Sequence, residues 1–122
     1  VNDEVEIEIP GGIRVVAIVT RESSDSLGLQ PGSEAFALVK SSSIIIVTEP
    51  RDARFSARNQ LLGTVTRVHP GAVNTEVVIE LPGGNTIAAI VTNESSQRLE
   101  LAPGKAVTAI FKASSVIVAI PA

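Results

Sequence analysis

The sequence consists of two copies of one pattern. Residues 1–50 align without a gap with residues 73–122 at an offset of 72 positions, and about half of the aligned residues are identical. Self-similarity of this length indicates two copies of one small structural unit. Residues 51–72 precede the second copy and have no counterpart before the first. We therefore expect a first domain at residues 1–50 that lacks its N-terminal strand, a linker at 51–55 and a second domain at 56–122.

Each copy carries the pattern of short strands joined by turns. Residues 1–9 alternate apolar and acidic side chains, a Pro-Gly-Gly turn follows, and residues 13–20 form an apolar run; together they predict a hairpin. A short helix is expected after Thr20, followed by strands at 34–40 and 44–48. The second domain, which consists of the second copy and the segment before it, predicts strands at 62–68, 75–81, 86–92, 106–112 and 116–120, with a helix near 94–99.

The complete second domain, residues 56–122, has about five predicted strands and one short helix. This size and element order predict an all-β protein made of two tandem, five-stranded barrels of the OB type, each with one short helix. The core must be aliphatic, because the chain has three Phe and no Trp, Tyr or Met.

Composition argues against several classes of function. A net charge of −3 gives no electrostatic footprint for nucleic acid. The absence of Cys excludes thiolate metal sites and a cysteine nucleophile. The apolar runs are as long as strands rather than membrane spans, so we expect no membrane partner and take the cytoplasm as the default location.

Catalytic and metal-ligating groups are scarce. The single imidazole, His69, precedes Pro-Gly and is expected to be an exposed turn residue. The acidic residues alternate along predicted strands, as solvated faces do, and no metal-ligand cluster is visible. We therefore expect no enzymatic activity.

Hydrogen-bond donors and positive charge gather in three kinds of short segment, two of which recur in both copies. Taken singly, each has an ordinary explanation as a helix cap, a solvated lysine or a linker. Together they favour a pocket for a doubly charged tetrahedral oxyanion, which needs many donors and a neutralising charge. The candidate residues are Ser56, Ala57, Arg58 and Asn59; Thr20, Ser23, Thr92 and Ser95; and Lys40, Ser41, Lys112 and Ala113.

A family resemblance rests on these same segments. The chain resembles the molybdate-binding Mop domain of the molbindins, in tandem form, over the runs Ser56-Ala57-Arg58-Asn59-x-x-x-Gly63-x-Val65, Ile90-Val91-Thr92-x-x-Ser95 and Lys112-Ala113-Ser114-x-Val116. The resemblance implies binding of molybdate and tungstate without an organic cofactor or direct protein–metal bonds. It also implies a homo-oligomer, with a trimer favoured.

The resemblance further implies how the oxyanion is held. Ser56, Arg58, Lys112 and Ala113 would come from one side, and a Thr-x-x-Ser segment from a neighbouring domain. The first copy lacks a counterpart of Ser56–Asn59, and Ser41 stands where the second copy has Ala113.

Two functional alternatives stay open beside molybdate storage and homeostasis. The chain could be the molybdate-sensing effector part of a transcription regulator, with a DNA-binding domain upstream. An OB-fold nucleic-acid binder is the other, but it predicts stacking aromatics and a basic groove, which this acidic, aromatic-poor chain does not supply.

Overall fold

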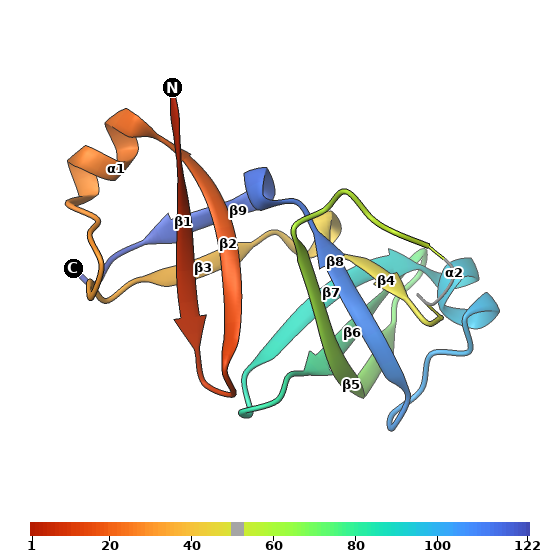
Figure 1. The fold of residues 1–122 in the computed structure, drawn as a ribbon. Helices are drawn as coiled ribbons and strands as arrows, with labels where there is room; N and C mark the ends of the chain where they lie inside the picture. Colours follow the sequence, from red (N-terminus) through yellow and green to blue (C-terminus); the bar gives the residue numbers. More distant parts are fainter. Residues whose placement is uncertain (50–52) are drawn as a thin grey trace.

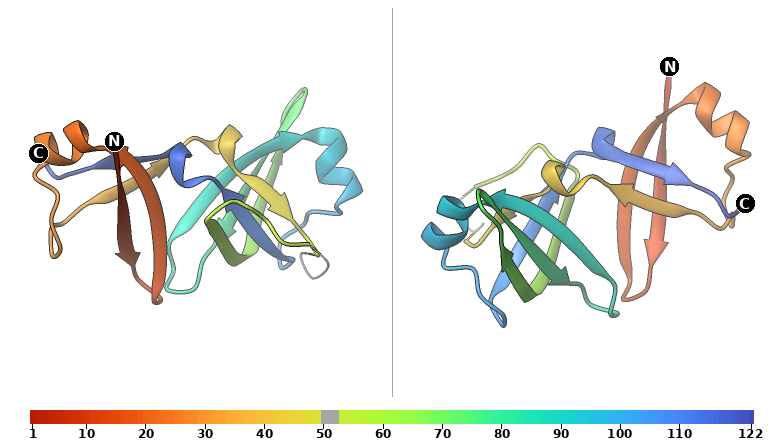
Figure 2. Two further views of the ribbon diagram at one scale, coloured as in Figure 1. Left: turned by 45° about the horizontal axis from the view of Figure 1, so that its top comes forward. Right: turned by 180° about the vertical axis from the view of Figure 1, so that it is seen from behind.

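The protein has two β lobes side by side in an elongated molecule (Figure 1). The structure, a computed structural model, describes residues 1–49 and 53–122. Residues 51 and 52 of the expected linker lie outside this described part. Figure 2 shows the same two lobes from above and from behind.

The lobe on the right of Figure 1 is a five-stranded antiparallel sheet in the order β4-β8-β5-β6-β7. Its strands are β4 (Ile45–Val47), β5 (Asn59–Pro70), β6 (Asn74–Glu80), β7 (Thr86–Thr92) and β8 (Ala106–Phe111). β5 pairs with β8 through its first half and with β6 through its second half. The β5–β6 ladder has a register shift between Val65 and Arg67, just beyond Thr64, the last residue of β5 that pairs with β8.

The other lobe is built from two antiparallel pairs. β1 (Asn2–Ile9) pairs with β2 (Ile13–Thr20), and β3 (Phe36–Val39) pairs with β9 (Val116–Ala119). Among residues 1–49 and 53–122, no strand of this lobe corresponds to β5. The expected all-β fold of two small barrels, the first without its N-terminal strand, is confirmed.

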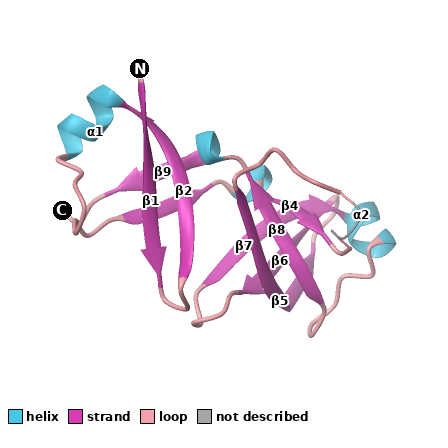
Figure 3. Ribbon diagram, viewed as in Figure 1, coloured by secondary structure: helices cyan, strands magenta, loops and turns pink. Residues whose placement is uncertain are grey.

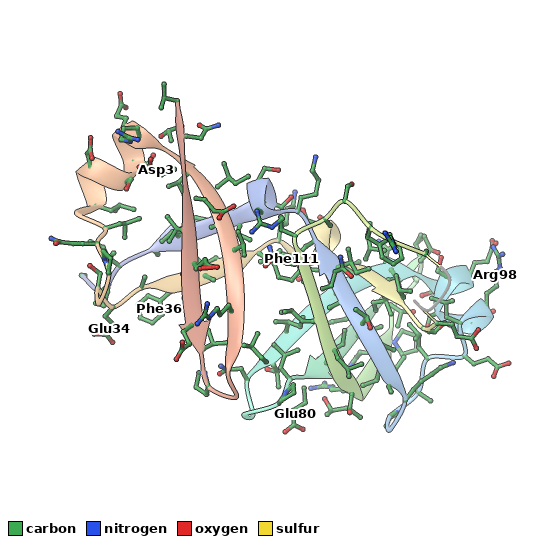
Figure 4. The ribbon with its side chains drawn as sticks, in the orientation of Figure 1. Asp3, Glu34, Phe36, Glu80, Arg98 and Phe111 are labelled. Atoms are coloured by element: carbon green, nitrogen blue, oxygen red, sulfur yellow. The ribbon has the colours of Figure 1, made fainter. Side chains whose placement is uncertain are left out.

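The helices are short, as expected. The α-helices are α1 (Arg21–Leu27) and α2 (Asn93–Arg98), and two single 3₁₀ turns are η1 (Ser41–Ser43) and η3 (Ala113–Ser115). Figure 3 shows α1 and α2 at opposite ends of the molecule, with the 3₁₀ turns between them. In Figure 4, Glu34 and Phe36 lie in the lobe that carries α1, and Arg98 lies at the opposite end, on α2. Phe111 lies between them.

The two copies exchange their last strands, which the sequence did not predict. β4 belongs to the first copy but pairs with β8 of the second, and β9 belongs to the second copy but pairs with β3 of the first. The predicted boundaries at residues 50 and 56 therefore mark where the sequence repeat ends and the second domain was expected to begin. As limits of folded domains they stay a prediction. In space, each lobe contains residues of both copies.

One expected element is longer than predicted. The strand expected at 62–68 runs from Asn59 to Pro70, so His69 lies in β5 and not in a turn. It extends because β8 pairs with it as far as Asn59 and β6 pairs with it as far as Pro70. His69 is exposed, as expected, and its Nδ1 lies 2.9 Å from Arg67 Nη2.

The lobes also meet at their hairpin turns, which lie next to each other in Figure 1. A Cβ atom built on Gly11 would lie 2.0 Å from the carbonyl oxygen of Pro82, and one built on Gly83 would lie 2.4 Å from that of Pro10. Both glycines have positive φ, at 93° and 96°. The two turns therefore pack backbone against backbone, a contact that only residues without a side chain permit.

The core is continuous between the lobes and almost entirely aliphatic. It joins buried side chains of β2, such as Val15 and Ala17, to Val65 of β5 and to Val77 and Ile79 of β6. Phe111 is an aromatic exception, 3% exposed.

Candidate functional site

Asn59 fixes the segment that carries Ser56 and Arg58. Its side chain is 1% exposed and bonds the backbone of β2 twice: Oδ1 accepts from Val16 N–H, and Nδ2 donates to the Val16 carbonyl, each at 2.8 Å. The side-chain amide of Asn59 thus makes the two hydrogen bonds that the backbone of a neighbouring strand would otherwise make with Val16. These two bonds fix the position of Asn59 and of the residues that precede it.

Two cations flank the position that Asn59 fixes. Asn59 and Phe111 are register partners at the end of the β5–β8 ladder, so Arg58 and Lys112 lie just beyond the last pair. Both residues are exposed, whereas Ala113 is buried. The turn η3 that Ala113 begins packs against β2. The structure therefore brings the Ser56–Asn59 segment, Lys112 and Ala113 together beside β2.

Arg58 is held by a carboxylate of the first copy. Its Nη1 lies 2.5 Å from Oε1 of Glu4, and the two side chains are 52% and 48% exposed. Glu4 is the register partner of Ile18, two residues before Thr20. Thr20 therefore lies about 7 Å further along β2 than Ile18, the residue paired with Glu4.

The two Thr-x-x-Ser segments have the same geometry. Thr20 caps α1: its Oγ1 accepts from the Ser23 N–H at 3.1 Å and donates to Ser23 Oγ at 2.9 Å. Thr92 does the same for α2, with Ser95, at 3.1 and 2.8 Å. Each serine Oγ accepts from the threonine, which leaves its own proton free to be donated elsewhere.

Lys40 and Ser41 repeat the arrangement of Lys112 and Ala113. Both lysines precede a 3₁₀ turn in extended conformation, with φ and ψ of −64° and 131° for Lys40 and −75° and 145° for Lys112. The turn after Lys40 packs against β7, just as η3 packs against β2.

The candidate residues thus form two sets, each drawn from both copies. The first lies along β2: Arg58 and Lys112 lie next to the residues that contact β2, and the Thr20–Ser23 pair lies at the end of that strand. The second lies around β7 and includes Lys40, Ser41, Thr92 and Ser95, without a counterpart of Arg58. Because the two helices cap opposite ends of the molecule (Figure 3), Thr20 and Thr92 do not share one site within a chain.

Sequence reasoning missed two features of this site. Glu4 was read as part of a solvated strand face, and nothing local links it to Arg58, which is 54 residues away. The second feature is that Asn59, a predicted oxyanion-binding residue, also bonds the backbone of Val16. A polar residue at the start of an otherwise apolar, alternating strand was the available signal that its side chain is buried for a structural reason.

A metal centre or a membrane span finds no support among residues 1–49 and 53–122. No group of three His, Cys, Asp or Glu side chains is placed to hold a metal ion. No helix in these ranges is long and apolar enough to cross a membrane.

Comparison with known proteins identifies the family. The TOBE domain model matches residues 1–46 and 56–118. The chain belongs to the TOBE domain family. The two matched segments correspond to the two sequence copies.

Relatives of this TOBE protein carry molybdenum in their names. The chain is 46% identical over 120 residues to the molybdenum transport protein ModE of Azotobacter vinelandii, covering 98% of this chain and 44% of that protein. It is 42% identical over 121 residues to the molybdenum-pterin-binding protein MopA of Rhodobacter capsulatus, covering 99% and 46%. The chain therefore spans less than half the length of these curated relatives.

A solved structure shares the whole fold. The cytoplasmic molybdate-binding protein ModG, in a form with molybdate bound, superposes with a TM-score of 0.95 at 45% identity, covering 99% of this chain and 86% of that one. This agreement extends over both lobes.

Proposed function

We propose that this chain binds molybdate, and also tungstate, as a non-enzymatic binding protein of two Mop-type barrels that serves molybdenum storage and homeostasis in the cytoplasm. The proposal is supported by the match to ModG with molybdate bound, whose description also says cytoplasmic. The donor and charge arrangement around β2 supports it independently of that match.

The observation that carries the proposal is the convergence of Arg58 and Lys112 at the end of the β5–β8 ladder. Two cations beyond one register pair neutralise a dianion, and the hydroxyl of Ser56 and the backbone N–H of Ala113 supply further donors. These donors suit a fully deprotonated tetrahedral oxyanion, which would compete with the Glu4 carboxylate for the Arg58 guanidinium.

Hydroxyl groups complete the proposed coordination. Thr20 with Ser23, and Thr92 with Ser95, each present a serine proton beside a helix start. α1 and α2 lie at the two ends of the molecule (Figure 1), where they are accessible to another copy. We propose a homo-oligomer, a trimer in the favoured form, in which one chain offers the cations and a neighbouring domain the hydroxyls.

Isothermal titration with molybdate, with sulfate as the competing tetrahedral dianion, tests the proposal. Tight molybdate binding with weaker sulfate binding is expected, together with an oligomeric mass by light scattering. Absence of molybdate heat at protein concentrations that maintain the oligomer would refute it.

A regulatory role is the second candidate. It is favoured by the identity to ModE of Azotobacter vinelandii over less than half of that protein's length, because a sensor unit needs an output domain elsewhere. In this version the chain itself makes no nucleic-acid contact. Molybdate-dependent DNA binding by the parent polypeptide, absent from the isolated chain, would favour regulation over storage.

A further inference from the structure

The two α-helices contribute little to the core. α1 has seven residues and buries none of them, and α2 has six residues and buries only Ser96. Helices this short are not stable by themselves in water. Burial of the helices therefore does little to hold the two hydroxyl pairs at their starts, Thr20 with Ser23 and Thr92 with Ser95.

Asn93, the first residue of α2, ties this helix to the segment that leads into β6. Its N–H donates to the Val73 carbonyl at 3.0 Å, and its Nδ2 donates to the Gly71 carbonyl at 3.0 Å. Its Oδ1 accepts from the Thr75 hydroxyl at 2.6 Å. Thr75 is 2% exposed, so water does not compete freely for its hydroxyl. Asn93 alone thus bonds three alternate residues of one segment.

The first copy holds α1 at the same place with different side chains. Arg21 is the counterpart of Asn93 at the offset of 72, and its N–H donates to the Val1 carbonyl at 3.1 Å. Its Nε lies 2.8 Å from Oδ1 of Asp3, the counterpart of Thr75, which Figure 4 shows beside α1. An ion pair in the first copy therefore takes the place of the amide–hydroxyl bond in the second.

We infer that Asn93 with Thr75, and Arg21 with Asp3, are positioning residues for the proposed oxyanion sites. The inference rests on the proposed function, because it concerns how the hydroxyl groups are held for the anion.

The link to the hydroxyls is short in the chain. Asn93 directly follows Thr92, whose Oγ1 accepts from the Ser95 N–H at 3.1 Å and donates to Ser95 Oγ at 2.8 Å. Fixing Asn93 thus fixes both hydroxyl-bearing residues before an anion arrives. Binding then has fewer groups to order, and pre-organisation of this kind raises affinity.

The two helix anchors should differ in their response to salt. The side chains of Arg21 and Asp3 are 59% and 25% exposed, and an exposed ion pair is weakened by screening. The bonds made by Asn93 join uncharged groups, which salt does not screen. The start of α1 should therefore loosen at high ionic strength, whereas the start of α2 should not.

The first test measures molybdate binding by calorimetry with the full chain. Asn93→Ala and Thr75→Val each remove hydrogen bonds at the start of α2 and should weaken binding about three- to tenfold. Thr75→Ser keeps the hydroxyl and should bind within about twofold of the unmodified chain. Thr66→Val is the matched control, since Thr66 Oγ1 also bonds a backbone carbonyl, that of Val78 at 3.3 Å, but lies outside the proposed sites; it should leave affinity unchanged.

The second test measures amide hydrogen exchange by NMR in the chain without ligand. Asn93→Ala should speed exchange of the Ser95 N–H about threefold or more relative to Ala109 in the core strand β8, because the helix start opens locally. A purely structural role would speed both amides together. Raising the salt concentration to about 1 M, where the Debye length is about 3 Å, should speed exchange at Ser23 relative to Ser95.

Several results would overturn the inference. These are unchanged affinity of both Asn93→Ala and Thr75→Val, no recovery with Thr75→Ser, an equal loss with Thr66→Val, or exchange at Ser95 that follows Ala109. A ratio of Ser23 to Ser95 exchange that salt does not alter would overturn the role of Arg21 and Asp3. An unmodified chain that binds no molybdate would instead refute the proposed function, and the exchange rates would still decide how the hydroxyl pairs are held.

Discussion

The contact between the two hairpin turns can be tested with a pair of substitutions matched in backbone strain. Gly83 and Gly84 both have φ of 96°, but a Cβ at Gly83 would lie 2.4 Å from the Pro10 carbonyl oxygen, whereas a Cβ at Gly84 meets nothing within 4 Å. Alanine at either place costs about 1–2 kcal/mol for the positive φ. At Gly83 it must also push the hairpins apart, at about 1–3 kcal/mol.

We therefore expect Gly84→Ala to lower the free energy of unfolding by about 1–2 kcal/mol and Gly83→Ala by about 2–5 kcal/mol. Urea denaturation followed by circular dichroism measures the difference, since the chain has no Trp or Tyr for fluorescence. The comparison requires equal slopes for both variants.

The reciprocal pair provides the control. A Cβ at Gly11 would lie 2.0 Å from the Pro82 carbonyl oxygen, while one at Gly12 meets nothing within 4 Å. Gly11→Ala should again be the more damaging change. Equal losses for Gly83→Ala and Gly84→Ala would show that the turns do not press against each other, and the described contact between the lobes would be wrong.

Three further predictions concern the proposed site. Arg58→Ala should weaken molybdate binding by about 1.5–3 kcal/mol, the contribution of a charge-assisted hydrogen bond, while Arg67→Ala further along β5 should not; calorimetry showing equal effects would remove Arg58 from the site. Glu4→Gln should tighten molybdate binding severalfold, because it removes a carboxylate 2.5 Å from the Arg58 guanidinium that competes with the anion; unchanged or weaker binding would contradict this competition. Asn59→Ala should lower the free energy of unfolding by about 2–4 kcal/mol, since it leaves the buried N–H and carbonyl of Val16 without partners. A loss below about 1 kcal/mol in urea denaturation would argue against the two hydrogen bonds between Asn59 and Val16.

Much of the local structure follows from sequence pattern. The Pro-Gly-Gly turns and the alternation along residues 1–9 predicted the β1–β2 hairpin, and Thr20 and Thr92 predicted the helix starts that they cap. These features are decided by residues near one another in the chain, so period and turn chemistry are sufficient to find them.

The strand exchange could not be found in this way. β4 and β9 have matching apolar patterns, and Ile46 and Val118 are buried almost equally, at 7% and 8% exposure. Judged by its apolar pattern alone, either strand could complete the core of either lobe. Which lobe receives which strand depends on the path of the chain between the lobes, and hydrophobic periodicity carries no information about that path.

For the proposed site, the sequence predicted the types of residue but not how these residues are arranged in space. Residue types indicated donors and cations, but pairing Arg58 with Glu4 requires the first and second copies to lie against each other. The structural role of Asn59 could not be predicted for the same reason, since its partner Val16 is 43 residues away.

The exchange of β4 and β9 between the two copies has a consequence for how such a protein can evolve and for what happens when the chain is cut into two fragments. A polypeptide containing one copy alone would find its closing strand only in another molecule, and two such molecules could satisfy each other by mutual donation. Joining two such molecules end to end would give a chain like the present one, and no contact would be needed that the pair did not already make. Cutting it between the copies should accordingly yield halves that reassociate, and neither half should persist as an independent monomer.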